Sequence, residues 1–243
     1  MTLEELKEAL LATDPAAVLV SPHLLARVIR EVQHLPAQTI SVPHRKSFII
    51  DRGTLFRHVE MDDLDLGADR MLPSTVILLA RPPLDRRTAL EREGALRTYW
   101  RRLFHANIHL SLQKRIDEGE LALEDVAARI AEIGLTEFEE IRAVLRQENY
   151  LFQDADDHAV YVEFAAVYLD LRYFLKDLPP VYFPAIRDFE RINQLLAQDV
   201  NADALFTRTR LAGATPRNFP PPGSKMSGLI GLGVLGRRRK AAR

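Results

Sequence analysis

The chain has 243 residues, of which 47% are hydrophobic and 28% are charged, and it contains no cysteine. The lack of cysteine excludes a disulfide-stapled scaffold, a cysteine-based zinc site and a thiol nucleophile. No apolar run approaches the roughly 20 residues that a membrane-spanning helix needs. The first residues also lack the basic and then apolar layout of a signal peptide. We therefore expect a cytoplasmic protein without a transmembrane segment.

Residues 1–83 predict a small α+β unit. Thr2 and Glu5 have the spacing of a capping box, so a first helix should begin there. Ser21 followed by Pro22 is typical of the start of a second helix. Short runs rich in strand-forming residues indicate strands at 18–20, 39–42, 47–50 and 75–79, with a hairpin turn at 43–46 and a short helix near 54–59.

Residues 84–208 predict a helical bundle. Residues 85–118 contain no proline and end at Gly119, which indicates one long helix. Its apolar side chains cover more than half of its circumference, so other helices should pack around it. Thr136 and Glu139 form a second capping-box pattern at the start of a later helix. The expected partner helices lie at 123–133, at 136–149, after the acidic residues 154–157, and at 189–197.

The last segment, residues 209–243, differs in composition from the rest of the chain. It holds eight basic and no acidic side chains, which leaves 25 basic and 34 acidic residues in 1–208. Proline and glycine are frequent, and few large apolar groups precede Leu229, so this tail cannot bury enough surface to offset its ordering entropy. The expected fold class is therefore mainly α: a small α+β unit, a helical bundle built on one long helix, and a disordered C-terminal tail.

His105 and His109 form the sharpest chemical pattern in the chain. Histidines four residues apart share one helix face and can reach one metal ion. The spacing resembles that of the zincin metallopeptidases, but the glutamate that serves those enzymes as general base would fall at Ala106. The alternative is that the two histidines only pack at the border of the apolar face. Possible third ligands on other predicted helices are Glu132, Glu137 and Glu163.

Two hypotheses for function follow from local patterns. One is a metal-dependent, hydrolase-like enzyme with a divalent metal such as zinc, held by His105, His109 and Glu163. The other is nucleic-acid binding, because a helix with basic residues precedes a basic turn, loosely as in a winged helix; the acidic stretch 60–69 argues against it. The residues that would contact nucleic acid are Arg27, Arg30, His44, Arg45 and Lys46.

The leading hypothesis from the sequence is a non-enzymatic adaptor that needs no cofactor. No complete catalytic set is recognisable, and an acidic body is joined to a basic tail that ends in an apolar plug followed by cations. Such a tail could contact a protein partner, nucleic acid or an anionic membrane surface. Its predicted partner-binding residues are Leu229, Ile230, Leu232, Leu235, Arg237, Arg238, Arg239 and Lys240.

Overall fold

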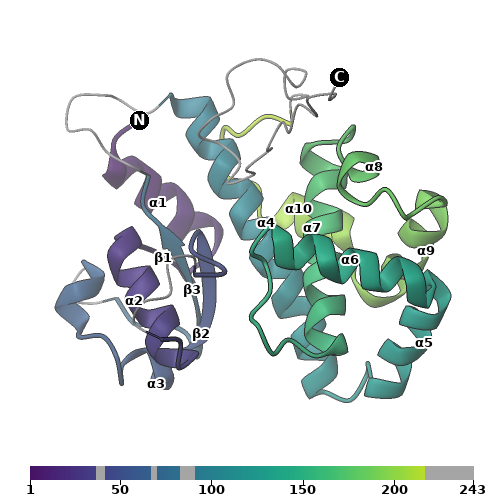
Figure 1. Ribbon diagram of the computed structural model, residues 1–243. Helices are drawn as coiled ribbons and strands as arrows, with labels where there is room; N and C mark the ends of the chain where they lie inside the picture. Colours follow the sequence, from purple (N-terminus) through teal and green to yellow (C-terminus); the bar gives the residue numbers. More distant parts are fainter. Residues whose placement is uncertain (37–41, 67–69, 83–90, 217–243) are drawn as a thin grey trace, which may run out of the picture.

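The computed structural model describes residues 1–36, 42–66, 70–82 and 91–216. They form a mainly α architecture, as predicted: a small N-terminal α+β unit stands beside a bundle of helices (Figure 1). The long helix α4 (Arg92–Asp117) runs through the middle of the molecule and contacts both parts. No helix in these residues is long and apolar enough to cross a membrane.

The N-terminal unit begins as its capping residues predict. The Thr2 hydroxyl accepts a hydrogen bond from the backbone N–H of Glu5 at 3.2 Å, and the Glu5 carboxylate accepts one from the N–H of Thr2 at 2.7 Å. Ser21 caps the second helix by accepting from the N–H of Leu24. The elements of this unit are α1 (Leu3–Thr13), β1 (Ala17–Val20), α2 (Pro22–Val32), β2 (Ser47–Asp51), α3 (Arg52–Leu55), a 3₁₀ turn (Met61–Leu64) and β3 (Thr75–Ala80).

The sheet has three strands in the order β1-β3-β2. β3 lies in the centre, parallel to β1 and antiparallel to β2. One face of the sheet packs on α1 and α4, and the other packs on α2, so all of β3 beyond Thr75 is buried. The first strand of the predicted hairpin, 39–42, falls mostly outside the described residues, and its last residue, Val42, is not in a strand. The second strand pairs with β3.

The helical unit packs around α4. Trp100, fully buried on α4, contacts the rings of Phe174 and Phe206, and its indole N–H donates to the Phe206 carbonyl at 3.0 Å. The first part of the predicted long helix, 85–90, lies outside the described residues, and α4 starts at Arg92. The helices around it are α5 (Leu123–Ile133), α6 (Leu135–Gln147), α7 (Asp157–Phe174), α8 (Pro179–Tyr182), α9 (Phe189–Asp199) and α10 (Ala202–Arg208).

The junction between α5 and α6 differs from the prediction. Gly134 is at once the C-cap of α5 and the N-cap of α6, with a φ of 108° that favours glycine. Because no other residue separates the two helices, Thr136 already lies within the first turn of α6 and caps nothing. The predicted capping box at Thr136 and Glu139 is therefore wrong.

The packed part of the chain extends beyond residue 208. Leu211 and Ala214 are fully buried, and the Thr215 hydroxyl donates to Glu93 on α4 at 2.6 Å. The sequence assigns these residues to the tail because glycine and proline are frequent around them. The remainder of the predicted tail, with all of the partner-binding residues named above, lies outside the described residues.

Candidate metal centre

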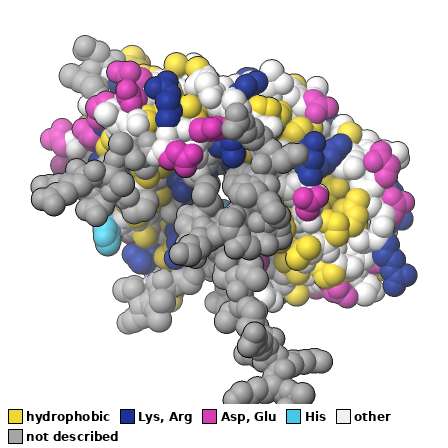
Figure 2. Space-filling model, turned by 90° about the horizontal axis from the view of Figure 1, so that it is seen from above, with side chains coloured by type: hydrophobic (Ala, Val, Ile, Leu, Met, Phe, Trp, Pro, Cys, Tyr) yellow, Lys and Arg dark blue, Asp and Glu magenta, His cyan; other side chains and the backbone are white. Residues whose placement is uncertain are grey.

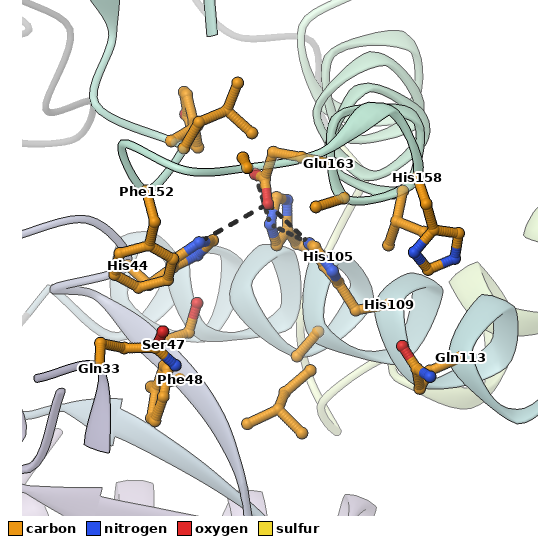
Figure 3. A pocket seen from close by; sticks show the side chains of 17 residues that line it. Gln33, His44, Ser47, Phe48, His105, His109, Gln113, Phe152, His158 and Glu163 are labelled. Atoms are coloured by element: carbon orange, nitrogen blue, oxygen red, sulfur yellow. Dashed lines mark hydrogen bonds and ion pairs between the residues drawn. The ribbon is translucent and has the colours of Figure 1, made fainter. Parts of the chain in front are cut away.

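Two helices bring His105, His109 and Glu163 together. The histidines lie one turn apart on α4, and their Nε2 atoms are 3.2 Å from each other. Glu163 lies on α7. Along the interface Arg101 meets Asp170 while His105 meets Glu163, so the two helices run antiparallel. This packing carries one carboxylate to the face that bears both imidazoles (Figure 3).

The ligand atoms of the three groups lie close to one another. His105 Nε2 lies 3.5 Å from Glu163 Oε1, and His109 Nε2 lies 3.1 Å from Glu163 Oε2. One ligand atom from each of the three residues lies within 4.8 Å of the others. Two ligands at about 2.0 to 2.1 Å from a tetrahedral ion lie about 3.3 Å apart. The three side chains are thus close enough together to hold one metal ion.

Glu163 is a buried carboxylate with unused bonding capacity. Only 2% of its side chain is exposed, and its Oε1 has no hydrogen-bond partner in the described chain. Burial opposes ionisation, but the neighbouring imidazoles of His109, His44 and His105 favour the charged carboxylate and hold the pKa of Glu163 well below its usual value. Glu163 is therefore an ionised carboxylate whose Oε1 contacts His105 but accepts no hydrogen bond from the described residues.

The same carboxylate acts on His105. Burial disfavours the charged imidazolium, but the close negative charge of Glu163 outweighs that effect and raises the pKa of His105. A proton on His105 and a metal ion at its Nε2 exclude each other, because only the deprotonated nitrogen can bind a metal. A metal ion that bound here would have to displace that proton.

A third imidazole faces the cluster from the N-terminal unit. His44 lies in the turn before β2, and its Nε2 is 3.9 Å from Glu163 Oε2. The φ angle of His44 is 56°, in the left-handed region that most residues avoid. Its ring packs against that of Phe152, with 5.3 Å between the ring centroids. Burial lowers the pKa of His44 to about 4, so this imidazole is neutral at pH 7.

The cluster lies in a pocket between the two units. The pocket has a volume of about 360 Å³ and is lined from one side by residues of α4 and α7 and from the other by residues of the turn and strand around β2. Figure 3 shows Glu163 above the two α4 histidines, with His44 to one side and Gln113 and His158 to the other. An ion held by these three side chains would be open to a fourth group from the pocket, as in catalytic zinc sites.

Of the three acids that the sequence proposed as a third ligand, the structure brings only Glu163 to the histidines. Glu132 is exposed and pairs with Arg129, and Glu137 does not line the pocket. A sequence signal for Glu163 exists: it is the one acid within the apolar stretch 159–167. A lone acid in such a stretch needs a buried partner. Ala106, where a zincin would have its general base, is buried and lines the pocket.

The structure places the residues proposed for nucleic-acid binding in different surroundings. His44 turns into the pocket, and Arg27 pairs with Asp63 at 3.0 Å. Lys46 is partly buried near Arg102 and Arg101. Arg30 is partly buried, and Arg45 is exposed. Figure 2 shows acidic and basic side chains interspersed over the face that it presents.

Comparison of the chain with protein-family models, curated proteins and solved structures finds no match. The side chains of the site are therefore the evidence on which a function can be proposed.

Proposed function

We propose that this protein binds a divalent transition-metal ion through His105, His109 and Glu163 and uses it on a small molecule in the adjoining pocket. The observation that carries the proposal is the convergence of the three groups, with Glu163 Oε1 buried and without a hydrogen-bond partner in the described residues. Imidazole and carboxylate donors without a thiolate suit zinc, and also iron, nickel or manganese. Zinc is the first candidate because histidine nitrogen and carboxylate oxygen are among its usual ligands in proteins.

An ion in this position would supply Lewis-acid chemistry, such as polarising a carbonyl oxygen of a bound substrate or lowering the pKa of a bound water. The chain itself holds the ligands in place through α4 and α7 and excludes bulk water by burying Glu163. Ala106 provides no proton-transfer group, so the site departs from the zincin pattern. The proposed class is a metal-dependent enzyme of the hydrolase type.

The adaptor hypothesis rests on residues 217–243, which lie outside the described part of the chain. A protein partner, a cytoplasmic location, and contact of the tail with nucleic acid or an anionic membrane surface stay predictions from the sequence. The metal site is preferred as a proposal because specific distances support it.

Metal analysis of the purified protein tests this proposal. After dialysis against zinc and removal of free ion, we expect one zinc per chain. At a free zinc concentration about 100 times the dissociation constant, binding stabilises the fold by about 2.7 kcal/mol. For a domain of this size that raises the melting temperature by roughly 5 to 10 °C, and a chelator should reverse the shift.

The variants His105→Ala and His109→Ala should lose both the bound zinc and the stabilisation. His58→Ala is the matched control, because His58 pairs with Glu31 and does not line the pocket. Circular dichroism confirms that each variant is folded. The proposal would be wrong if the wild type and the three variants all bound the same amount of zinc, well below one ion per chain. The two histidines and Glu163 would then only share protons with one another.

A further inference from the structure

Lys46 is a partly buried cation that has no ion-pair partner in the described chain. It lies in the turn before β2, and no hydrogen bond joins its amine to another residue that the structure describes. Burial, followed by repulsion from Arg102 and Arg101, lowers the pKa of the amine to about 8, so most of it is still charged at pH 7. A charge that is withdrawn from water without a partner lowers the stability of the fold.

Hydrogen bonds at the end of β3 connect Lys46 to Arg102 on α4. The N–H of Ala80, the last residue of β3, donates to the carbonyl of Lys46 at 3.0 Å, and the carbonyl of Ala80 accepts from Arg102 Nη1 at 2.8 Å. The Arg102 guanidinium also lies over the ring of Tyr99, 4.7 Å from its centroid. Like Lys46, Arg102 has no acid within ion-pair distance in the part of the chain that the structure describes. Two cations that no acid neutralises therefore come together from different units.

The carboxylate that attracts the Lys46 amine, that of Asp170, is already paired. Arg101 Nε donates to both of its oxygens at 2.7 Å, and Arg101 Nη2 is 2.6 Å from Oδ2. Arg45, which precedes Lys46, is exposed and adds a positive charge that has no ion pair among the described residues. Together with Arg102, these groups are four cations and one acid, which leaves three positive charges when Lys46 is protonated.

A cluster of this kind is stabilised by an anion. Like charges that are held together repel each other, and an anion next to them replaces repulsion with attraction. Proteins often retain a destabilising arrangement where it serves binding. The alternative is that the Lys46 side chain only packs its hydrocarbon part on the fold and keeps its amine in water. Loss of Lys46 would then leave the binding of anions unchanged.

The cluster lies beside the pocket of the candidate metal centre. His44 and Ser47, which come before and after Lys46 in the chain, line that pocket (Figure 3), and Arg102 lies about one turn before His105 on α4. A phosphate group carries a charge of about −1.5 to −2 at pH 7, and lysine and arginine are its usual partners. We infer that Lys46 and Arg102 form a binding site for the phosphate group of a small molecule, next to the pocket and separate from the three proposed metal ligands.

A small molecule is favoured over a nucleic acid because the basic residues of α2 do not extend this cluster. Arg27 pairs with Asp63 at 3.0 Å, and Arg30 is partly buried. A nucleic acid needs a row of accessible cations that follows its phosphate backbone. Binding of a nucleic acid is therefore an outcome that the experiment has to distinguish.

Protein NMR titrations of the full-length, chelator-treated protein test the site at pH 7 and constant ionic strength. The probes are inorganic phosphate, phenyl phosphate, acetate and a short DNA duplex. We expect both phosphates to bind saturably at millimolar concentrations, and acetate to bind more weakly because it carries a single charge. Lys46→Met should weaken the binding of both phosphates by about tenfold or more, the effect of one charge-assisted hydrogen bond. Lys46→Arg, which keeps the charge, should retain most of the affinity. Lys114→Met, the same substitution at an exposed position of α4, should leave it unchanged.

Several results would overturn the inference: no saturable binding of either phosphate, equal phosphate affinity in Lys46→Met and the wild type, or acetate that binds as tightly as phosphate. A duplex that binds more tightly than phenyl phosphate, and loses this affinity in Lys46→Met, would assign the cations to nucleic acid instead. The outcome is separable from that of the proposed function, since the chelator removes any bound metal. His109→Ala should lose zinc and keep its affinity for phosphate. If His109→Ala abolished phosphate binding, the anion would bind at the metal ligands and the inference would be wrong.

Discussion

His44 Nε2 lies 3.9 Å from Oε2 of Glu163, and the two atoms belong to different units of the fold. The imidazole comes from the turn before β2, and the carboxylate comes from α7. Both units therefore line the pocket, and the charge of Glu163 in the helical unit acts on His44 in the N-terminal unit. The first prediction concerns this pair.

His44→Asn should make the metal-free protein less sensitive to mild acid. The pKa of His44 is lowered to about 4, so between pH 6.5 and pH 4 the unfolded chain binds a proton that the folded chain does not. Above pH 6.5 the imidazole is neutral in both states, so His44 does not lower the free energy of unfolding. That free energy falls by about 3 kcal/mol as the pH drops from 6.5 to 4. Asparagine removes the titrating ring and tolerates the left-handed backbone.

Urea unfolding at several pH values between 4 and 7 measures this effect as the difference between wild type and variant. His23→Asn is the control, since His23 is exposed on α2. A variant with the same pH dependence as the wild type would contradict the prediction.

Glu163→Gln should lower the pKa of His105 in metal-free protein. The carboxylate raises that pKa against the effect of burial, so a neutral amide of the same shape leaves burial unopposed. NMR titration of the His105 ring measures the pKa directly, and it should be lower than in the wild type. Glu31→Gln, which removes the partner of His58, should not move it. An unchanged His105 pKa in the Glu163→Gln variant would show that the two groups are not coupled.

Asp170→Asn should destabilise the protein by about 3 to 5 kcal/mol, because it leaves the Arg101 guanidinium buried without its counter-charge. The double variant Arg101→Met with Asp170→Leu should recover most of that loss, since it removes both charges. Urea unfolding at pH 7 measures both effects. Glu118→Gln is the control, because its pair with Lys114 is exposed and should be worth less than about 1 kcal/mol. Equal losses in Asp170→Asn and Glu118→Gln would refute the argument.

Lys46→Met should stabilise the protein at pH 7 by about 1 to 3 kcal/mol, and the gain should disappear at high pH. Burial, followed by repulsion from Arg102 and Arg101, lowers the pKa of Lys46 to about 8. Below pH 8 the buried charge of Lys46 therefore lowers the free energy of unfolding. This loss disappears as the pH rises towards 10.5, because the lysine of the folded state is then neutral. Unfolding free energies at pH 7, 9 and 10.5 test this trend. Lys114→Met, at an exposed position on α4, should show no such trend.

Local signals in the sequence predicted the elements well. The Thr2–Glu5 capping box and the Ser21–Pro22 start act within one helical turn, so they can be recognised without knowledge of the tertiary fold. Thr136 shows the limit of such signals. Its pattern is the same as that of Thr2, but the helix starts earlier because Gly134 serves two helices at once.

The candidate site was predicted only in part. The spacing of His105 and His109 is local, and it correctly indicated a shared helix face. Which acid joins them depends on the antiparallel packing of α4 and α7, and no periodicity encodes that. The sequence groups His44 with Arg45 and Lys46 because they are neighbours along the chain. The turn separates them in space, since His44 lines the pocket and Arg45 is exposed.

β3 takes part in two separate hydrophobic cores. Ile77 and Leu79 belong to the core that includes the helical bundle, while Val76 and Leu78 belong to the core under α2. The carbonyl of Ala80 at the end of the same strand accepts hydrogen bonds from Tyr99 and Arg102 on α4. Dividing the gene near codon 83 would therefore yield two insoluble or molten fragments, and the intact chain should melt in a single calorimetric peak in which both parts lose structure together.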